Sequence, residues 1–138
     1  MKRIFVLAAL ASVCILSSCK KFEEGPAFSF RSIKSRLHGE WKIESYSVNG
    51  TDQTSTFVSA QGANFMLEIE KDGTYRTEGN FADSGTWELG EDKDDIRFKS
   101  SGSSSEMSFR ILRLTNKEFW AKQTQSNSDV WEYKYKAE

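Results

Sequence analysis

Histidine, cysteine and proline are scarce in this sequence of 138 residues. His38 is the single histidine, and one histidine at the start of a strand is too little for a Ser-His-Asp triad. Glu68 and Glu70 alternate with apolar residues, which is typical of a solvated strand face and not of paired catalytic carboxylates. No glycine-rich loop that could cradle a phosphate is present. The sequence therefore predicts that the protein is not an enzyme and holds no cofactor.

An excess of charge of either sign is also missing. The chain has 19 basic and 20 acidic residues, and no basic patch is interleaved with aromatic residues. This balance argues against a nucleic-acid partner. The densest acidic stretch, Asp92 to Asp95, lacks the glycine and the terminal glutamate of an EF-hand calcium loop. We therefore expect a charged turn there and no metal site.

Both cysteines lie near the start of the chain, in a segment that predicts export. Lys2 and Arg3 are followed by an almost wholly apolar run, residues 4–16, and the run ends at Ser17, Ser18 and Cys19. A basic start, an apolar middle and small residues before a cleavage point make a secretory signal. The apolar run is shorter than the roughly 20 residues that span a bilayer.

The four residues Leu16-Ser17-Ser18-Cys19 resemble the bacterial lipobox. The resemblance implies that residues 1–18 are removed and that Cys19 carries acyl chains such as palmitate, which attach the protein to a membrane. Several acyl chains anchor almost irreversibly, because each buried methylene contributes about 0.8 kcal/mol. An ordinary secretory signal with a chance cysteine is the alternative. If Cys19 is acylated, no thiol remains for a disulfide, and the core alone must stabilise the domain.

Residues 19–36 are predicted to form a flexible tether between the lipid and the domain. The segment is polar and contains the only proline, Pro26, and residues 32–37 are expected to form a short helical turn. Lys20-Lys21-Phe22-Glu23-Glu24 resembles the surface-export signal of Bacteroidetes lipoproteins, although a merely solvated linker explains it as well. We expect a lipid anchor in the outer membrane, on its periplasmic or cell-surface face.

Residues 37–138 are predicted to form one domain of β-strands. Apolar and polar residues alternate with a period of two in eight segments, which are separated by turn signals such as Asp72-Gly73. The segments are residues 40–48, 64–70, 74–79, 85–89, 96–98, 106–114, 117–123 and 130–136. In residues 106–114 the alternation slips at Leu112, which indicates a β-bulge.

Eight consecutive strands with short connections favour an all-β fold, an eight-stranded antiparallel up-and-down β-barrel. Such a barrel encloses the apolar face of every strand and leaves no unpaired edge. A small β-sandwich is the alternative. Only the connection formed by residues 50–63 is long enough for the crossover that a sandwich would need.

The first strand begins with Leu37-His38-Gly39-Glu40-Trp41-Lys42-Ile43, which resembles the Gly-x-Trp motif of lipocalins. "DGTY" at 72–75, "GTWEL" at 85–89 and "LTNKEFW" at 114–120 are similar to the lipocalin-like domains of Bacteroidetes lipoproteins. The resemblance implies a lipocalin-like barrel whose floor is closed by Trp41 beneath an arginine from the end of the barrel. No arginine follows Arg113, so Lys134 or Lys136 would have to take that place.

The inward-facing residues allow two interpretations. They line a cavity for a small apolar or amphipathic ligand, or they fill the barrel as a packed core. Buried hydroxyl groups need hydrogen-bond partners, so the tyrosines of the last strand are expected near a barrel mouth. The candidate ligand-lining residues are Trp41, Phe65, Leu67, Tyr75, Trp87, Phe98, Phe109, Phe119, Trp131, Tyr133 and Tyr135.

Two further aromatic residues predict a different function. Tyr46 is in phase with Glu44, and Trp120 is in phase with Lys122, so both rings are expected to face outward. Exposed aromatic residues are common anchors of protein interfaces. The alternative function is therefore a protein-binding module of the cell envelope, such as an inhibitor, an immunity protein or a subunit of an outer-membrane complex.

Overall fold

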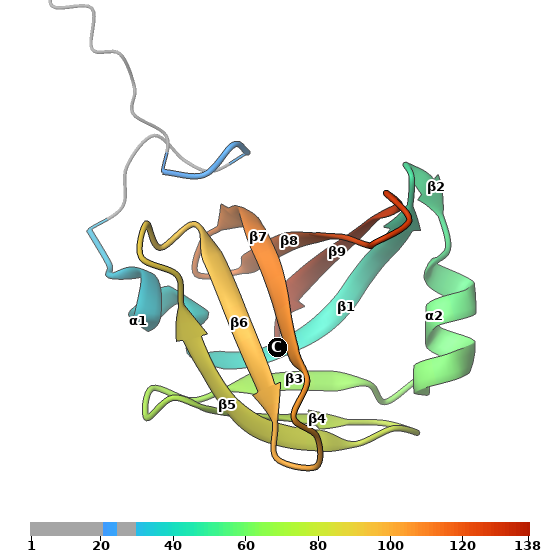
Figure 1. Ribbon diagram of the computed structural model, residues 1–138, viewed down its shortest axis with the longest axis horizontal. Coiled ribbons are helices and arrows are strands. Elements are labelled where there is room, and N and C mark those ends of the chain that lie inside the picture. The colour runs from blue at the N-terminus through green and yellow to red at the C-terminus, as the bar shows by residue number, and fades with distance from the viewer. Residues whose placement is uncertain (1–20, 25–29) are drawn as a thin grey trace, which may run out of the picture.

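The computed structural model describes residues 21–24 and 30–138, so the predicted signal sequence and Cys19 lie outside the described residues. Eight strands form a closed antiparallel barrel, and a ninth strand of two residues pairs with the end of β1 (Figure 1). The elements are α1 (Ile33–Leu37), β1 (Gly39–Val48), β2 (Thr51–Asp52), α2 (Thr54–Gln61), β3 (Met66–Ile69), β4 (Thr74–Glu78), β5 (Asp83–Leu89), β6 (Asp95–Ser100), β7 (Glu106–Leu114), β8 (Glu118–Thr124) and β9 (Val130–Ala137).

The barrel closes because β1 pairs with two partners along its length. Residues 39–42 of β1 pair with β3, and residues 41–48 pair with β9, while from β3 to β9 each strand pairs with the next one in sequence. The predicted up-and-down barrel is therefore confirmed, and the sandwich is excluded. The short helix expected at residues 32–37 is present as α1.

The predicted bulge is also present, and β1 contains a second one. The pairing of β7 with β8 changes register from Ile111 to Arg113, so the bulge lies at Leu112. The register between β1 and β9 shifts between Ile43 and Ser45. A bulge moves the following side chains to the opposite face of the strand. The second bulge therefore decides where Tyr46 points.

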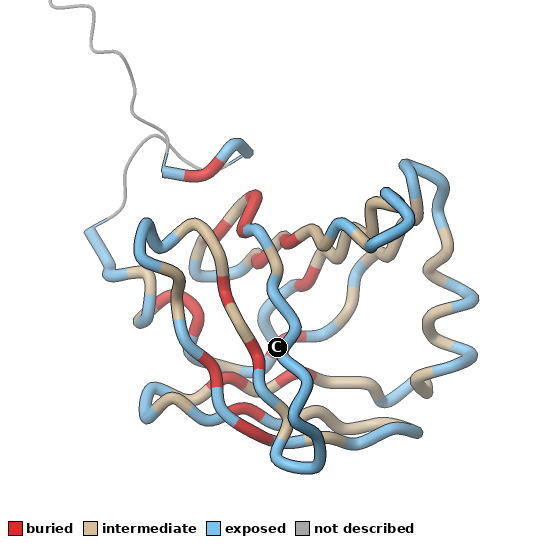
Figure 2. Tube along the Cα trace, viewed as in Figure 1, coloured by how far each residue is buried: buried red, intermediate tan, exposed pale blue. Residues whose placement is uncertain are grey.

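The most deeply buried side chains gather at the end of the barrel beside α1, which we call the closed end (Figure 2). Trp41 is 1% exposed, its indole N–H donates to the carbonyl of Leu37 at 2.8 Å, and its ring meets Phe119 edge-on at 5.7 Å. Gly39 has a φ of +141°, which L side chains rarely adopt, so the glycine of the Gly-x-Trp motif permits this backbone.

The arginine at the closed end comes from an unexpected part of the chain. Arg36 of α1 is buried, and its guanidinium donates to the carbonyl of Leu114 at 2.6 Å. Burial lowers the pKa of Arg36. Lys134 lies over the ring of Trp120, and Lys136 is exposed, so neither takes the place expected from the lipocalin resemblance.

Residues 21–24 lie against β7. Phe22 is only 3% exposed. The backbone N–H of Glu24 donates to the carbonyl of Leu112 at 2.8 Å, and the guanidinium of Arg113 donates to the carbonyl of Glu24 at 2.7 Å. This part of the tether segment is thus packed on the barrel, which brings the start of the described chain to the barrel surface.

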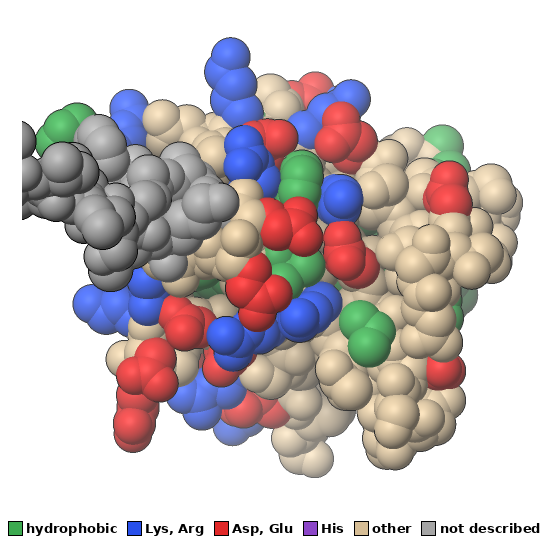
Figure 3. All heavy atoms as spheres, turned by 90° about the horizontal axis from the view of Figure 1, so that it is seen from above, with side chains coloured by type: hydrophobic (Ala, Val, Ile, Leu, Met, Phe, Trp, Pro, Cys, Tyr) green, Lys and Arg blue, Asp and Glu red, His purple; other side chains and the backbone are tan. Residues whose placement is uncertain are grey.

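Basic and acidic side chains are interspersed on the face shown in Figure 3. Glu23 pairs with Arg110 at 3.2 Å and with Lys122 at 3.5 Å, and Glu118 pairs with Arg113 at 2.8 Å. These pairs link residues 21–24 and strands β7 and β8 through opposite charges. In the part of the chain that the structure describes, no helix is long and apolar enough to cross a membrane.

Candidate ligand-binding site

Helix α2 lies at the open end of the barrel, opposite α1 (Figure 1). Because β3 pairs with residues 39–42 only, the second half of β1 has no β3 neighbour, and α2 spans from β2 to β3 at this point (Figure 1). The carboxylate of Asp52 accepts the backbone N–H of Thr54 at 2.8 Å and its hydroxyl at 2.6 Å. The backbone N–H of Tyr46 donates to the same hydroxyl oxygen at 3.0 Å, which ties the helix to β1.

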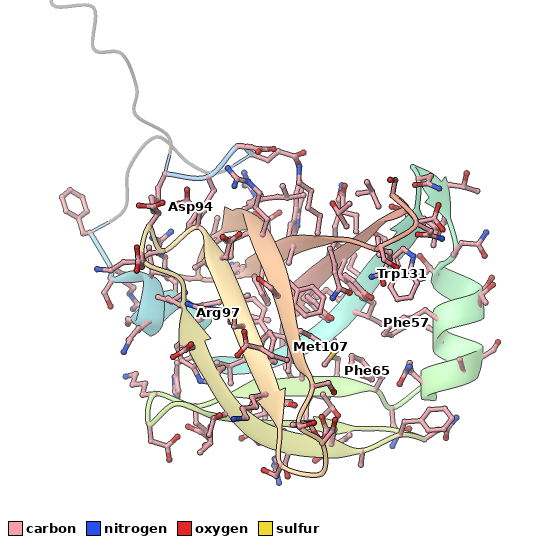
Figure 4. All side chains as sticks on the ribbon, viewed as in Figure 1. Phe57, Phe65, Asp94, Arg97, Met107 and Trp131 are labelled. Carbon is pink, nitrogen blue, oxygen red and sulfur yellow. The ribbon has the colours of Figure 1, made fainter. Side chains whose placement is uncertain are left out.

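A cavity of about 310 Å³ opens at this end of the barrel, which we call the mouth. This volume lies at the lower limit of ordinary small-molecule sites. Phe57 of α2 and Phe65, just before β3, lie near each other at the mouth (Figure 4). The lining residues are Phe57, Gln61, Phe65, Leu67, Tyr75, Thr77, Phe81, Asp83, Phe98, Met107, Phe109, Tyr133 and Tyr135.

Aromatic rings meet edge to face around the cavity. The ring centroids of Phe57 and Phe65 are 5.1 Å apart, and those of Phe109 and Tyr133 are 5.6 Å apart, with interplanar angles of 87° and 81°. These arrangements are the favourable ones for aromatic pairs. The rings support one another from α2, β7 and β9, so the apolar wall does not depend on a single element.

The polar groups of the cavity centre on Asp83. Its carboxylate accepts the hydroxyl of Tyr75 at 2.7 Å and the hydroxyl of Ser100 at 2.6 Å, while its backbone N–H donates to Thr77 Oγ1 at 2.9 Å. Burial raises the pKa of Tyr75, and the neighbouring Asp83 carboxylate raises it further. The Tyr75 hydroxyl therefore stays protonated and remains a donor to Asp83.

Two tyrosines of β9 lie at different depths. Burial raises the pKa of Tyr133, as does its neighbour Tyr46, and burial is also the main cause that raises the pKa of Tyr135. Tyr135 is buried and stacks on Phe119 at 5.6 Å, so it forms the base of the cavity, where it adjoins the closed-end core. Both hydroxyl groups are neutral at physiological pH.

Seven of the eleven predicted ligand-lining residues line this cavity. They are Phe65, Leu67, Tyr75, Phe98, Phe109, Tyr133 and Tyr135. The other four lie elsewhere. Trp41 and Phe119 fill the closed end, and the buried indole of Trp87 donates to the carbonyl of Glu70 at 2.8 Å. Trp131 packs edge-on against Tyr46 at 6.3 Å and does not line the cavity.

The outward orientation expected for Tyr46 is wrong. Because of the bulge after Ile43, its ring contacts Phe57 at 5.2 Å and Tyr133 at 5.0 Å, at the mouth. Trp120 does lie on the outside of the barrel. Lys134 covers its ring at 4.1 Å from the centroid, so the ring is only partly exposed.

Six residues that line the cavity are absent from the predicted set, although the sequence pattern could have identified some of them. They are Phe57, Gln61, Thr77, Phe81, Asp83 and Met107. Thr77 and Asp83 follow from period-two alternation, since Thr77 is in phase with Tyr75 and Asp83 is in phase with Trp87. Phe57 and Gln61 lie on α2, which no sequence pattern predicted.

Comparison with known proteins supports the fold alone. No family model matches the chain, and no curated protein matches its sequence. A lipocalin-like protein from Bacteroides uniformis has a similar structure, with a TM-score of 0.55 at 11% sequence identity, over 75% of this chain and 99% of that one. The domain is therefore a lipocalin-like β-barrel. The more specific resemblance to the lipocalin-like domains of Bacteroidetes lipoproteins stays a prediction.

Proposed function

We propose that the protein is a lipid-anchored protein of the cell envelope whose barrel binds a small apolar or amphipathic molecule at its mouth. The observation that carries the proposal is the cavity of about 310 Å³, which is walled by aromatic rings and contains few polar groups. An apolar wall with a small number of placed polar groups is the usual composition of small-molecule sites. Eight-stranded lipocalin-like barrels are wide enough to hold one small ligand. Binding without chemistry is the proposed activity.

The packing of residues 21–24 supports an anchor close to the barrel. The chain from Cys19 to Lys21 spans at most about 7 Å when fully extended. Lys21 forms an ion pair with Asp94 in the turn between β5 and β6, at the closed end. A lipid on Cys19 would thus hold the closed end near the bilayer. The mouth, at the other end of β5 and β6, would then be free to receive a ligand.

A Gln61→Trp substitution is expected to weaken ligand binding at least tenfold. Gln61 lines the cavity from α2, so an indole there would occupy the mouth without disturbing the closed-end core. The measurement is a fluorescence titration of purified protein with the neutral dye N-phenylnaphthylamine. Ser59→Trp, on the exposed face of the same helix, is the matched control and should bind as wild type does.

This experiment also shows when the proposal fails. If the wild-type protein binds neither the dye nor other apolar compounds more tightly than about 100 μM, roughly −5.5 kcal/mol, the cavity is not a ligand site. If Gln61→Trp and Ser59→Trp bind the dye equally well, the dye lies somewhere other than the mouth.

The alternative function, a non-enzymatic protein-binding module, has less support from the contacts. Its predicted anchors were Tyr46 and Trp120. Tyr46 packs among the aromatic rings of the mouth, and Trp120 lies between the guanidinium of Arg113 at 5.3 Å and the ammonium of Lys134 at 4.1 Å. Neither ring is free to enter a partner's pocket, so the small-ligand function is the better supported of the two.

A further inference from the structure

Asp83 is the only charged residue among the described residues that line the cavity. The two side chains that donate hydrogen bonds to it, Tyr75 and Ser100, are neutral hydroxyl groups. In the described part of the chain, no basic side chain forms an ion pair with it. Among the described residues, the cavity thus contains one carboxylate that hydrogen bonds stabilise but that no basic side chain neutralises.

The carboxylate is ionised at neutral pH. Burial raises the pKa of Asp83, but hydrogen bonds from Ser100, Tyr75 and the backbone of Ser84 outweigh this effect and leave the pKa below its ordinary value. An ionised carboxylate offers about four lone-pair positions, so the two hydroxyl groups and the backbone N–H of Ser84 leave room for about one further donor. The two hydroxyl groups hold the carboxylate in one orientation at the cavity wall.

The aromatic rings of the cavity also favour a positively charged ligand, as the Asp83 carboxylate does. Tyr75, whose hydroxyl donates to Asp83, meets Phe98 at 5.0 Å, and Phe98 meets Phe109 at 5.9 Å, so the carboxylate shares the cavity with a row of aromatic rings. The face of an aromatic ring attracts a cation, and the attraction is stronger where water is excluded. An anionic head group would instead meet the Asp83 carboxylate with no basic side chain of the cavity wall to neutralise it.

We propose that the ligand is an amphiphilic cation, with an apolar body among the rings and a protonated amine or quaternary ammonium group beside Asp83. This inference rests on the proposed function and names the ligand class of the same site. The aromatic wall accounts for the apolar body, and the carboxylate that no basic side chain neutralises accounts for the cationic group. Fatty acids and other anionic amphiphiles are then poor ligands, although their apolar parts fit the cavity equally well.

The test uses three probes with the same ten-carbon chain and different head groups: decylammonium, decanol and decanoate. Each is titrated into the purified protein with bound N-phenylnaphthylamine at pH 7, below the concentration at which the probe aggregates, and displacement of the dye is measured. We expect decylammonium to bind at least tenfold more tightly than decanoate, with decanol between them. This comparison uses wild-type protein and therefore does not depend on how well a variant folds.

An Asp83→Asn variant then assigns the preference to this carboxylate. The amide has nearly the same shape and still accepts a hydrogen bond, but it carries no charge. We expect decylammonium to bind about tenfold more weakly to Asp83→Asn, and the difference between the three probes to disappear. Asp92→Asn, in the exposed turn between β5 and β6, changes the net charge equally and should keep the wild-type preference.

Each outcome has a distinct meaning. If the three probes bind wild type equally well, or if a folded Asp83→Asn variant keeps the preference for decylammonium, the inference of a cationic ligand is overturned while the apolar cavity stands. If the dye itself does not bind, the proposed function fails first, and the ligand class fails with it.

Discussion

Trp41→Ala is expected to lower the free energy of unfolding by about 3–5 kcal/mol, as deletion of a large buried aromatic side chain does. Trp41 is 1% exposed and packs against Phe119 at the closed end. The substitution also removes the indole N–H that donates to the carbonyl of Leu37, so α1 loses a hydrogen bond to β1. The measurement is urea unfolding at equilibrium, followed by circular dichroism.

Trp120→Ala is the matched control, because it removes the same side chain from the outer face of β8. We expect this variant to lower the free energy of unfolding by only about 1 kcal/mol, since the ring is only partly buried under Lys134 and Arg113. Equal losses for the two variants, or a loss below about 1 kcal/mol for Trp41→Ala, would contradict the assignment of Trp41 as the floor of the barrel.

Cys19→Ala is expected to abolish acylation completely. The lipobox interpretation makes the thiol of Cys19 the only acceptor of the lipid, so no other residue replaces it. The measurement is expression in a bacterial host in the presence of an alkyne-labelled palmitate, followed by detection of the label on the protein. Wild type should carry the label, and Cys19→Ala should carry none.

Cys14→Ala is the control, because it removes the other thiol from within the predicted signal sequence. It should be labelled as wild type is. If Cys19→Ala still carries the label, or if wild type carries none, the protein is not anchored through this cysteine, and the envelope part of the proposed function has to be abandoned. The ligand-binding part would remain, since it depends on the mouth alone.

The barrel could be predicted from sequence because its strands repeat a local pattern. Successive side chains of a strand point to opposite faces, so a strand with one buried face shows a period of two. All eight barrel strands show this pattern, with one slip each in β1 and β7. The slip at Leu112 predicted the bulge in β7 for the same reason. Trp41 and Ile43 are followed by Tyr46 and Val48, which is the same kind of slip, and it accounts for the inward orientation of Tyr46.

Helix α2 could not be predicted, because its sequence is not typical of a helix. Thr54, Thr56 and Val58 are β-branched, and such residues and serine favour other conformations. The helix forms where the end of β1 separates from β3, which is a property of the closed barrel and not of the local sequence. Two of the thirteen residues that line the cavity, Phe57 and Gln61, lie on this helix. The site was therefore predicted in part only.

A nuclear magnetic resonance titration locates the ligand site within the molecule. Amide resonances of ¹⁵N-labelled protein are followed while N-phenylnaphthylamine is added to saturation. The proposed function predicts the largest shifts for Phe57, Phe65 and Phe109 at the mouth, with little change at Trp41. Shifts concentrated around Trp120 on the outside of the barrel, or no shifts at saturating dye, would contradict a ligand site in the mouth of this barrel.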